Sequence, residues 1–189
     1  MDIMDFDSNN DDLQEPEDKK DSFEDQIRQF KDRLKDGKGG STNIEALEEI
    51  VGFYFENEKY EEALHFISLL LEYVPFSAET WQRKGIILNN LQRHEEALNC
   101  FDKALNLNPV DSELIISRGV TFDYLGRYEE ALECFNRILE IDSSNEEAIF
   151  SKAIAFEKLD RFEDAVKMFR YILDGNSSHK DAWYEMGYC

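Results

Sequence analysis

The sequence predicts an all-α fold built from a repeated pair of antiparallel helices. Three observations support this prediction. Similar segments return every 34 residues without an insertion, apolar residues within them are spaced i, i+3 and i+4, and only three prolines interrupt 189 residues. Apolar side chains at that spacing occupy one face of a helix. A repeat of about 20–50 residues is typical of solenoids.

The repeat is visible in columns of equivalent residues. Each second helix opens with a ring-bearing residue, two acids, alanine and an aliphatic residue, at positions 60–64, 94–98, 128–132 and 162–166. Two further columns are mostly large and apolar or mostly small: Leu47, Trp81, Ile115, Ile149 and Trp183, then Val51, Gly85, Gly119, Ala153 and Gly187. These copies in register indicate one repeated structural unit.

Each unit reads as two helices joined by a short polar turn. The first two units end at Pro75 and Pro109, because proline cannot continue a helix. The third and fourth units have Ser143 and Ser177 at these places. We expect these serines to end one helix and cap the next.

The second unit carries the pattern Trp81, Gly85, Leu88, Ala97, Phe101, Ala104 and Pro109. This pattern resembles the tetratricopeptide repeat. The resemblance covers four units, at 44–77, 78–111, 112–145 and 146–179, and the start of a fifth at 180–189. It implies a right-handed α-solenoid of helical hairpins whose first helices line a concave groove. Gly85 and Ala97 are small where helices must approach closely, while Trp81 and Phe101 are expected to fill the space between neighbouring pairs.

The residues before the repeats fall into two parts. Residues 1–22 contain nine acids and two lysines, so we expect a disordered acidic tail. Residues 23–43 combine an amphipathic helix with a glycine-rich linker. We favour a leading helix that covers the exposed face of the first unit. The alternatives are a segment that fills the groove until a partner displaces it, a helix that does not dock, and a disordered segment.

Residues 180–189 begin another first helix in register and then end. Because repeat arrays need a solvated last element, we expect the sequence to be a fragment of a longer chain. If it is complete, Trp183, Met186 and Tyr188 would offer an apolar end face for self-association.

Composition narrows the classes of function. A net charge of −21 argues against binding to nucleic acid or to anionic membranes. No apolar run approaches the roughly 20 residues needed to span a bilayer, and the acidic N-terminus does not resemble a secretory signal. We therefore predict a cytoplasmic protein whose three cysteines are reduced.

No residue pattern predicts catalysis, a cofactor or a metal site. The three histidines are isolated in sequence, and His94 occupies the ring-bearing column, where we expect it to be packed. Cys100 and Cys134 share an apolar column and are expected to be buried structural thiols. Neither zinc-ligand spacing nor a phosphate-binding glycine loop is present.

The resemblance places the binding surface on the groove side of the first helices. The candidate partner-binding residues are Phe55, Gln82, Arg83, Ile86, Asn89, Asn90, Ile116, Val120, Tyr124, Phe150, Ile154, Lys158 and Tyr184. Along the groove floor the resemblance places Gly52, Ile86, Val120, Ile154 and Tyr188.

The resemblance also bears on the ligand. Tetratricopeptide adaptors of heat-shock chaperones hold a C-terminal carboxylate with lysine, asparagine and arginine. The matching positions here are Glu48, Gly52, Arg83, Glu113 and Ser117, and none fits in kind. We therefore expect a non-enzymatic interaction scaffold that binds a basic and apolar protein or peptide segment. The alternative is a docking or regulatory module of a larger enzyme whose catalytic part lies beyond residue 189.

Overall fold

The computed structural model describes residues 25, 27–30, 32 and 42–189, and every regular element in them is an α-helix. The predicted acidic tail and most of the linker lie outside the described residues. The bounds are α2 (Thr42–Glu56), α3 (Tyr60–Tyr73), α4 (Ala78–Asn90), α5 (His94–Leu107), α6 (Ser112–Tyr124), α7 (Tyr128–Ile141), α8 (Glu146–Lys158), α9 (Phe162–Gly175) and α10 (Lys180–Tyr188).

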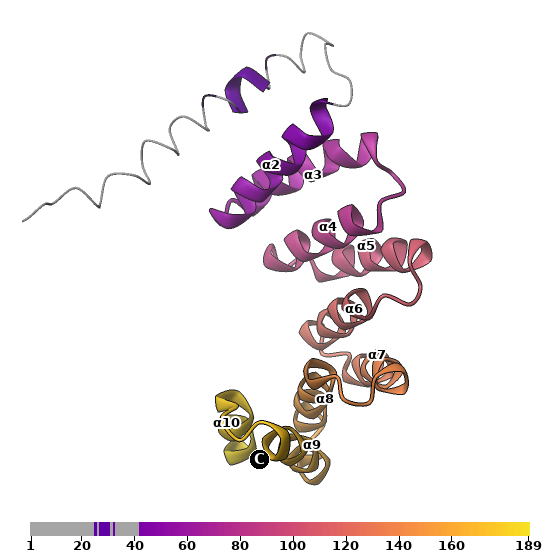
Figure 1. The fold of residues 1–189 in the computed structure, drawn as a ribbon, viewed down its shortest axis with the longest axis vertical. Coiled ribbons are helices and arrows are strands. Elements are labelled where there is room, and N and C mark those ends of the chain that lie inside the picture. The colour runs from indigo at the N-terminus through magenta and orange to yellow at the C-terminus, as the bar shows by residue number, and fades with distance from the viewer. Residues whose placement is uncertain (1–24, 26, 31, 33–41) are drawn as a thin grey trace, which may run out of the picture.

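The helices form hairpins that stack in an arc. Each helix from α2 to α9 packs against the next one along the chain, and α4 contacts α6 and α6 contacts α8. In Figure 1, α2, α4 and α6 follow the inner side of the arc, while α3, α5 and α7 follow its outer side. The predicted all-α solenoid is confirmed.

In the second, third and fourth units, a phenylalanine from the second helix lies at the centre of the core. Phe101, Phe135 and Phe169 are at most 1% exposed. A Cβ added at Gly85 would lie 2.7 Å from Phe101 Cε1. A Cβ added at Gly119 would lie 2.6 Å from Phe135 Cε1. The close helix approach predicted at Gly85 is therefore present.

Trp81 packs against the edge of the core cluster that contains Phe101. Its indole is only half-buried, donates Nε1–H to the Pro75 carbonyl at 2.9 Å, and has the Lys103 ammonium 4.2 Å from its ring centroid. Trp183 makes the equivalent bond to the Ser177 carbonyl at 2.9 Å. Each indole fastens a helix to the preceding turn, because its N–H needs an acceptor.

The caps of the first helices differ from the expectation. The N-cap of α8 is Asn145, which lies two residues after Ser143. Its Oδ1 accepts a hydrogen bond from the Ala148 amide. In α10, His179 Nδ1 accepts from the Ala182 amide. The capping role predicted for Ser143 and Ser177 was wrong. Asparagine and other side chains with an acceptor atom at the N-cap position satisfy the free amides of the first turn.

The turn within each hairpin contains one residue in the left-handed region. These residues, again 34 positions apart, are Glu58 (φ 56°), Gln92 (φ 61°), Gly126 (φ 71°) and Asp160 (φ 57°). Only glycine adopts this conformation without steric cost. The turns at Glu58, Gln92 and Asp160 are therefore strained relative to the turn at Gly126.

Part of the leading segment packs on the first unit. Ile27 and Phe30 are each 3% exposed and share a core cluster with Leu47, Ile50 and Tyr54. The cluster continues into α3, so these two residues extend the core of the first hairpin.

Candidate functional site

The inner side of α4 and α6 holds a cleft of about 610 Å³. Its lining is Ile86, Asn89, Asn90, Gln92, His94, Phe101, Ile116, Ser117, Val120, Tyr124 and Glu147. Six of the thirteen predicted residues therefore meet in one place, because groove-facing positions on neighbouring first helices are in register. Glu147 joins them from α8, and His94 joins from the start of α5.

Asn89 is held in a fixed orientation at this cleft. Its Nδ2 donates to Thr121 Oγ1 at 2.8 Å, and its Oδ1 lies 3.1 Å from His94 Nδ1. Because an amide oxygen only accepts, His94 donates in this bond. The His94 ring also contacts the Tyr124 ring, with centroids 5.1 Å apart. His94 is thus both packed, as predicted, and part of the cleft, which the sequence analysis missed.

A second pocket, of about 190 Å³, lies between α2 and α4. Its lining is Val51, Gly52, Phe55, Glu56, Arg83, Ile86 and Ile87. It brings together three predicted residues, Phe55, Arg83 and Ile86. Since Ile86 also lines the larger cleft, the two openings adjoin on the same inner surface. We call them the small pocket and the large cleft.

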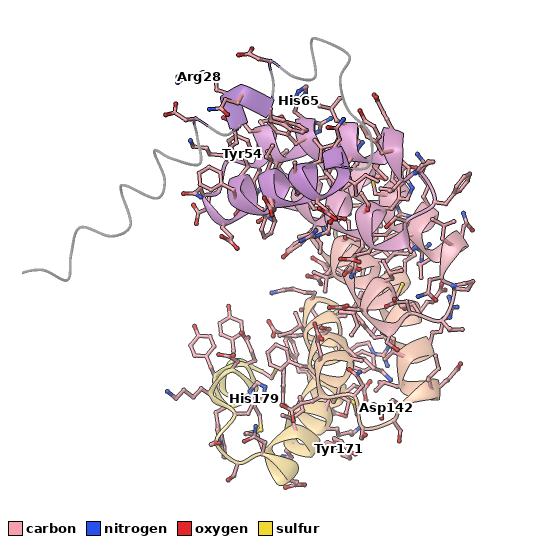
Figure 2. All side chains as sticks on the ribbon, turned by 45° about the horizontal axis from the view of Figure 1, so that its top comes forward. Arg28, Tyr54, His65, Asp142, Tyr171 and His179 are labelled. Atoms are coloured by element: carbon pink, nitrogen blue, oxygen red, sulfur yellow. The ribbon has the colours of Figure 1, made fainter. Side chains whose placement is uncertain are left out.

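The other predicted residues line neither opening. Phe150 packs against Phe169 and stacks on His179, with centroids 5.7 and 5.4 Å apart. Ile154 packs against the core, and Gln82 is half-buried on α4. Lys158 is exposed, with Nζ 3.6 Å from Glu157 Oε1. Tyr184 is 72% exposed on α10. In Figure 2, His179 lies in the lower limb of the arc and Tyr54 in the upper one.

Three carboxyl groups gather near the ends of α6, α8 and α10. Asp123 Oδ1 and Glu157 Oε2 are buried without a hydrogen-bond partner, and Glu157 is 7% exposed. Burial raises the pKa of Asp123, which Glu157 raises further and Lys158 lowers. Burial and then Glu157 raise the pKa of Glu185. Acids at helix C-termini oppose the helix dipole, and that sequence signal could have identified this cluster.

The described residues carry few groups suited to other chemistry. Cys100 and Cys134 are buried free thiols, and burial raises the pKa of both. Within the described part of the chain, no group of three or more His, Cys, Asp and Glu side chains could hold a metal ion. None of its helices combines the length and apolar character needed to cross a bilayer.

A match to a known family agrees with this geometry. The profile of the tetratricopeptide repeat family matches residues 76–144, which include α4 to α7. Residues 76–144 therefore match tetratricopeptide repeats. No curated protein sequence matches it.

Solved structures of several proteins share the fold. The chain is similar to a tetratricopeptide repeat protein from Parabacteroides merdae ATCC 43184 (TM-score 0.74, 19% identity, covering 88% of this chain and 71% of that one). It is also similar to MamA 41-end from Desulfovibrio magneticus RS-1 (0.71, 19%, 79% and 84%). A third similar structure is the first TPR of Spaghetti (RPAP3) bound to the HSP90 peptide SRMEEVD (0.56, 20%, 59% and 89%). At these identities the likeness concerns the fold alone.

Proposed function

We propose that the chain is a protein-interaction scaffold whose inner surface binds a polypeptide segment carrying basic and apolar residues. The observation that carries this proposal is the large cleft, where apolar, amide and acidic side chains from α4, α6 and α8 converge. The inner surface would bind its partner in the same way whether the protein acts alone or as the docking module of a larger enzyme.

The apolar part of the cleft supports contact with a partner's aliphatic side chains. Ile86 and Val120 are partly exposed in its wall, and Tyr124 is 59% exposed beside them. Exposed tyrosine supplies a large, rigid contact area and often dominates binding energy. Asn90 is also exposed; its Nδ2 donates to the Ile86 carbonyl at 2.9 Å, and its amide oxygen is left to accept from the partner's backbone.

The charged part of the surface supports a basic partner. Glu147 lines the large cleft, and Glu79 and Glu113 are exposed at the equivalent repeat position. Among the described residues that line the large cleft, Glu147 carries a carboxylate and none is a lysine or an arginine. Carboxylates around the groove would speed the arrival of a cationic segment and make its association sensitive to salt.

The structure solved with the HSP90 peptide sharpens the contrast. That peptide, SRMEEVD, has two glutamates and a C-terminal aspartate. The positions matching the chaperone clamp are Glu48, Gly52, Arg83, Glu113 and Ser117, of which two carry acids. Like charges across an interface disfavour a wrong partner. We therefore expect this chain to bind a basic segment, although it shares its fold with a protein that binds the acidic SRMEEVD peptide.

The test reverses one charge in the large cleft. Spacing of about 10 Å between helix pairs gives a groove that accommodates roughly 12 extended residues. A 12-residue peptide of alternating lysine and leucine is titrated calorimetrically into the wild type, Glu147→Lys and Glu140→Lys. Glu140 is exposed on α7, so the last variant is matched in charge.

The expected result is about tenfold weaker binding to Glu147→Lys and unchanged binding to Glu140→Lys. Equal affinity for all three proteins, or no binding to the wild type, would contradict the proposal. Ile116 and Phe150 are unsuitable for this test. Ile116 is 6% exposed, and Phe150 packs on Phe169, so their replacement would disturb the fold.

A further inference from the structure

One position on the groove floor has no side chain. Ile86, Val120, Ile154 and Tyr188 occupy the floor position in the later units, and Gly52 occupies it in the first. A Cβ at Gly52 would meet no atom within 4 Å, in contrast to Gly85, where it would collide with Phe101. Packing within the protein therefore does not require a glycine at position 52, although glycine inside a helix is destabilising relative to alanine.

The missing side chain opens the small pocket. Its inner walls are Val51 and Ile87, which are 2% and 1% exposed, and its outer walls include Phe55, which is 37% exposed. A cavity of about 150 Å³ lined by aliphatic and aromatic groups accommodates a benzene molecule. The small pocket, at about 190 Å³, is thus large enough for one leucine, isoleucine, methionine or phenylalanine side chain.

The rim favours a neutral occupant over a charged one. Glu56 and Arg83 stand on the rim with opposite charges. The described lining thus carries no net charge, and its other side chains are hydrocarbon. A charged side chain would lose hydration there without gaining a matched partner, while an apolar one would remove its own surface and that of Val51 and Ile87 from water.

We propose that the small pocket binds one large apolar side chain of the partner, which anchors the segment at the N-terminal end of the groove. This inference rests on the proposed function, because the anchor belongs to the segment that occupies the large cleft. Ile86 forms a wall of both openings, so one continuous segment reaches both. The anchor gives the partner a required apolar position, next to basic residues that meet the acidic groove.

The first experiment examines the pocket without a peptide. N-acetyl-leucine amide is titrated into the protein while the methyl resonances of Val51, Ile86 and Ile87 are followed by NMR. We expect saturable shifts in the wild type and in Gly175→Leu, a matched substitution at a glycine whose Cβ would also meet nothing within 4 Å. We expect loss of these shifts in Gly52→Leu, where the new side chain fills the pocket. N-acetyl-lysine amide should produce no saturable shift.

Unmoved methyl resonances in the wild type, or equal shifts in Gly52→Leu, would overturn the inference whether or not any peptide binds. The second experiment tests coupling to the groove. Replacing the leucine nearest Gly52 in a bound lysine–leucine peptide by alanine should weaken binding at least tenfold in the wild type and less than twofold in Gly52→Leu. If the amide binds and no peptide does, the proposed function fails and the pocket stands.

Discussion

The ring of Phe101 lies where a side chain at Gly85 would have to be, with Cε1 and Cζ both 2.7 Å from the Cβ position. Because Phe101 is fully buried, it has little room to move. Gly85→Ala should therefore destabilise the protein by roughly 1–3 kcal/mol through overpacking. Urea unfolding followed by circular dichroism measures this change.

Gly52→Ala is the matched control for that substitution. It makes the same chemical change in the preceding unit, but its Cβ enters open space. Alanine is the better helix former by about 0.5–1 kcal/mol, so this variant should be as stable as the wild type or more so. Equal destabilisation by both substitutions would disprove the packing explanation for Gly85.

Opposite substitutions in two equivalent turns test the left-handed position. Gly126→Ala should lose about 1 kcal/mol, because alanine is strained at φ 71°. Glu58→Gly should gain up to about 1 kcal/mol by relieving the strain at φ 56°. Thermal unfolding of the two variants measures these effects. Changes of the same sign would contradict the common backbone geometry.

Substitutions at Asn145 and Ser143 test which of the two residues caps α8. Asn145→Ala removes the bond from the Ala148 amide and should cost about 1 kcal/mol. Ser143→Ala changes an exposed turn residue and should alter the unfolding free energy by less than about 0.5 kcal/mol. A larger cost at Ser143 would restore the cap that the sequence suggested.

Asp123 should make stability depend on pH. Burial raises the pKa of this carboxyl, with Glu157 adding to the effect and Lys158 opposing it. The folded state thus holds the proton more tightly than the unfolded state, and its stability rises as pH falls through the raised pKa. Asp123→Asn should be more stable than the wild type near about pH 7, and the difference should shrink towards about pH 4.

An amide keeps the size of the carboxyl group and carries no charge that burial would penalise. Urea unfolding at several pH values measures the difference between the two proteins. Asp174→Asn, an exposed change on α9, is the control and should leave stability unaltered. An Asp123→Asn variant that is less stable near neutral pH would contradict the account.

The repeated helices were predictable because a local pattern recurs with the same spacing and each copy confirms the others. The helical period also identifies which positions share a face, so Ile86, Asn89 and Val120 could be placed together before the structure was known. The close contact at Gly85 was also predictable, because two helices that approach this closely leave no room for a side chain between them.

The remaining features depend on contacts between units, which sequence spacing does not contain. Phe150 occupies a groove position, yet His179, which caps α10 of the following unit, stacks on it and leaves it half-buried. Trp81 bonds to the preceding turn, because that turn presents the Pro75 carbonyl to its indole. The exchange of Ser143 for Asn145 as the cap reflects the path of the loop, where Ser144 bonds to Asp142.

The most direct measurement compares two peptides that differ only in charge. SRMEEVD and its counterpart with lysines at the three acidic positions are titrated calorimetrically at low and at high salt. We predict that the lysine peptide binds, that its affinity falls as salt rises, and that SRMEEVD does not bind. Binding of SRMEEVD as tight as that of the lysine peptide would contradict the assignment of an acidic, apolar groove for basic partners.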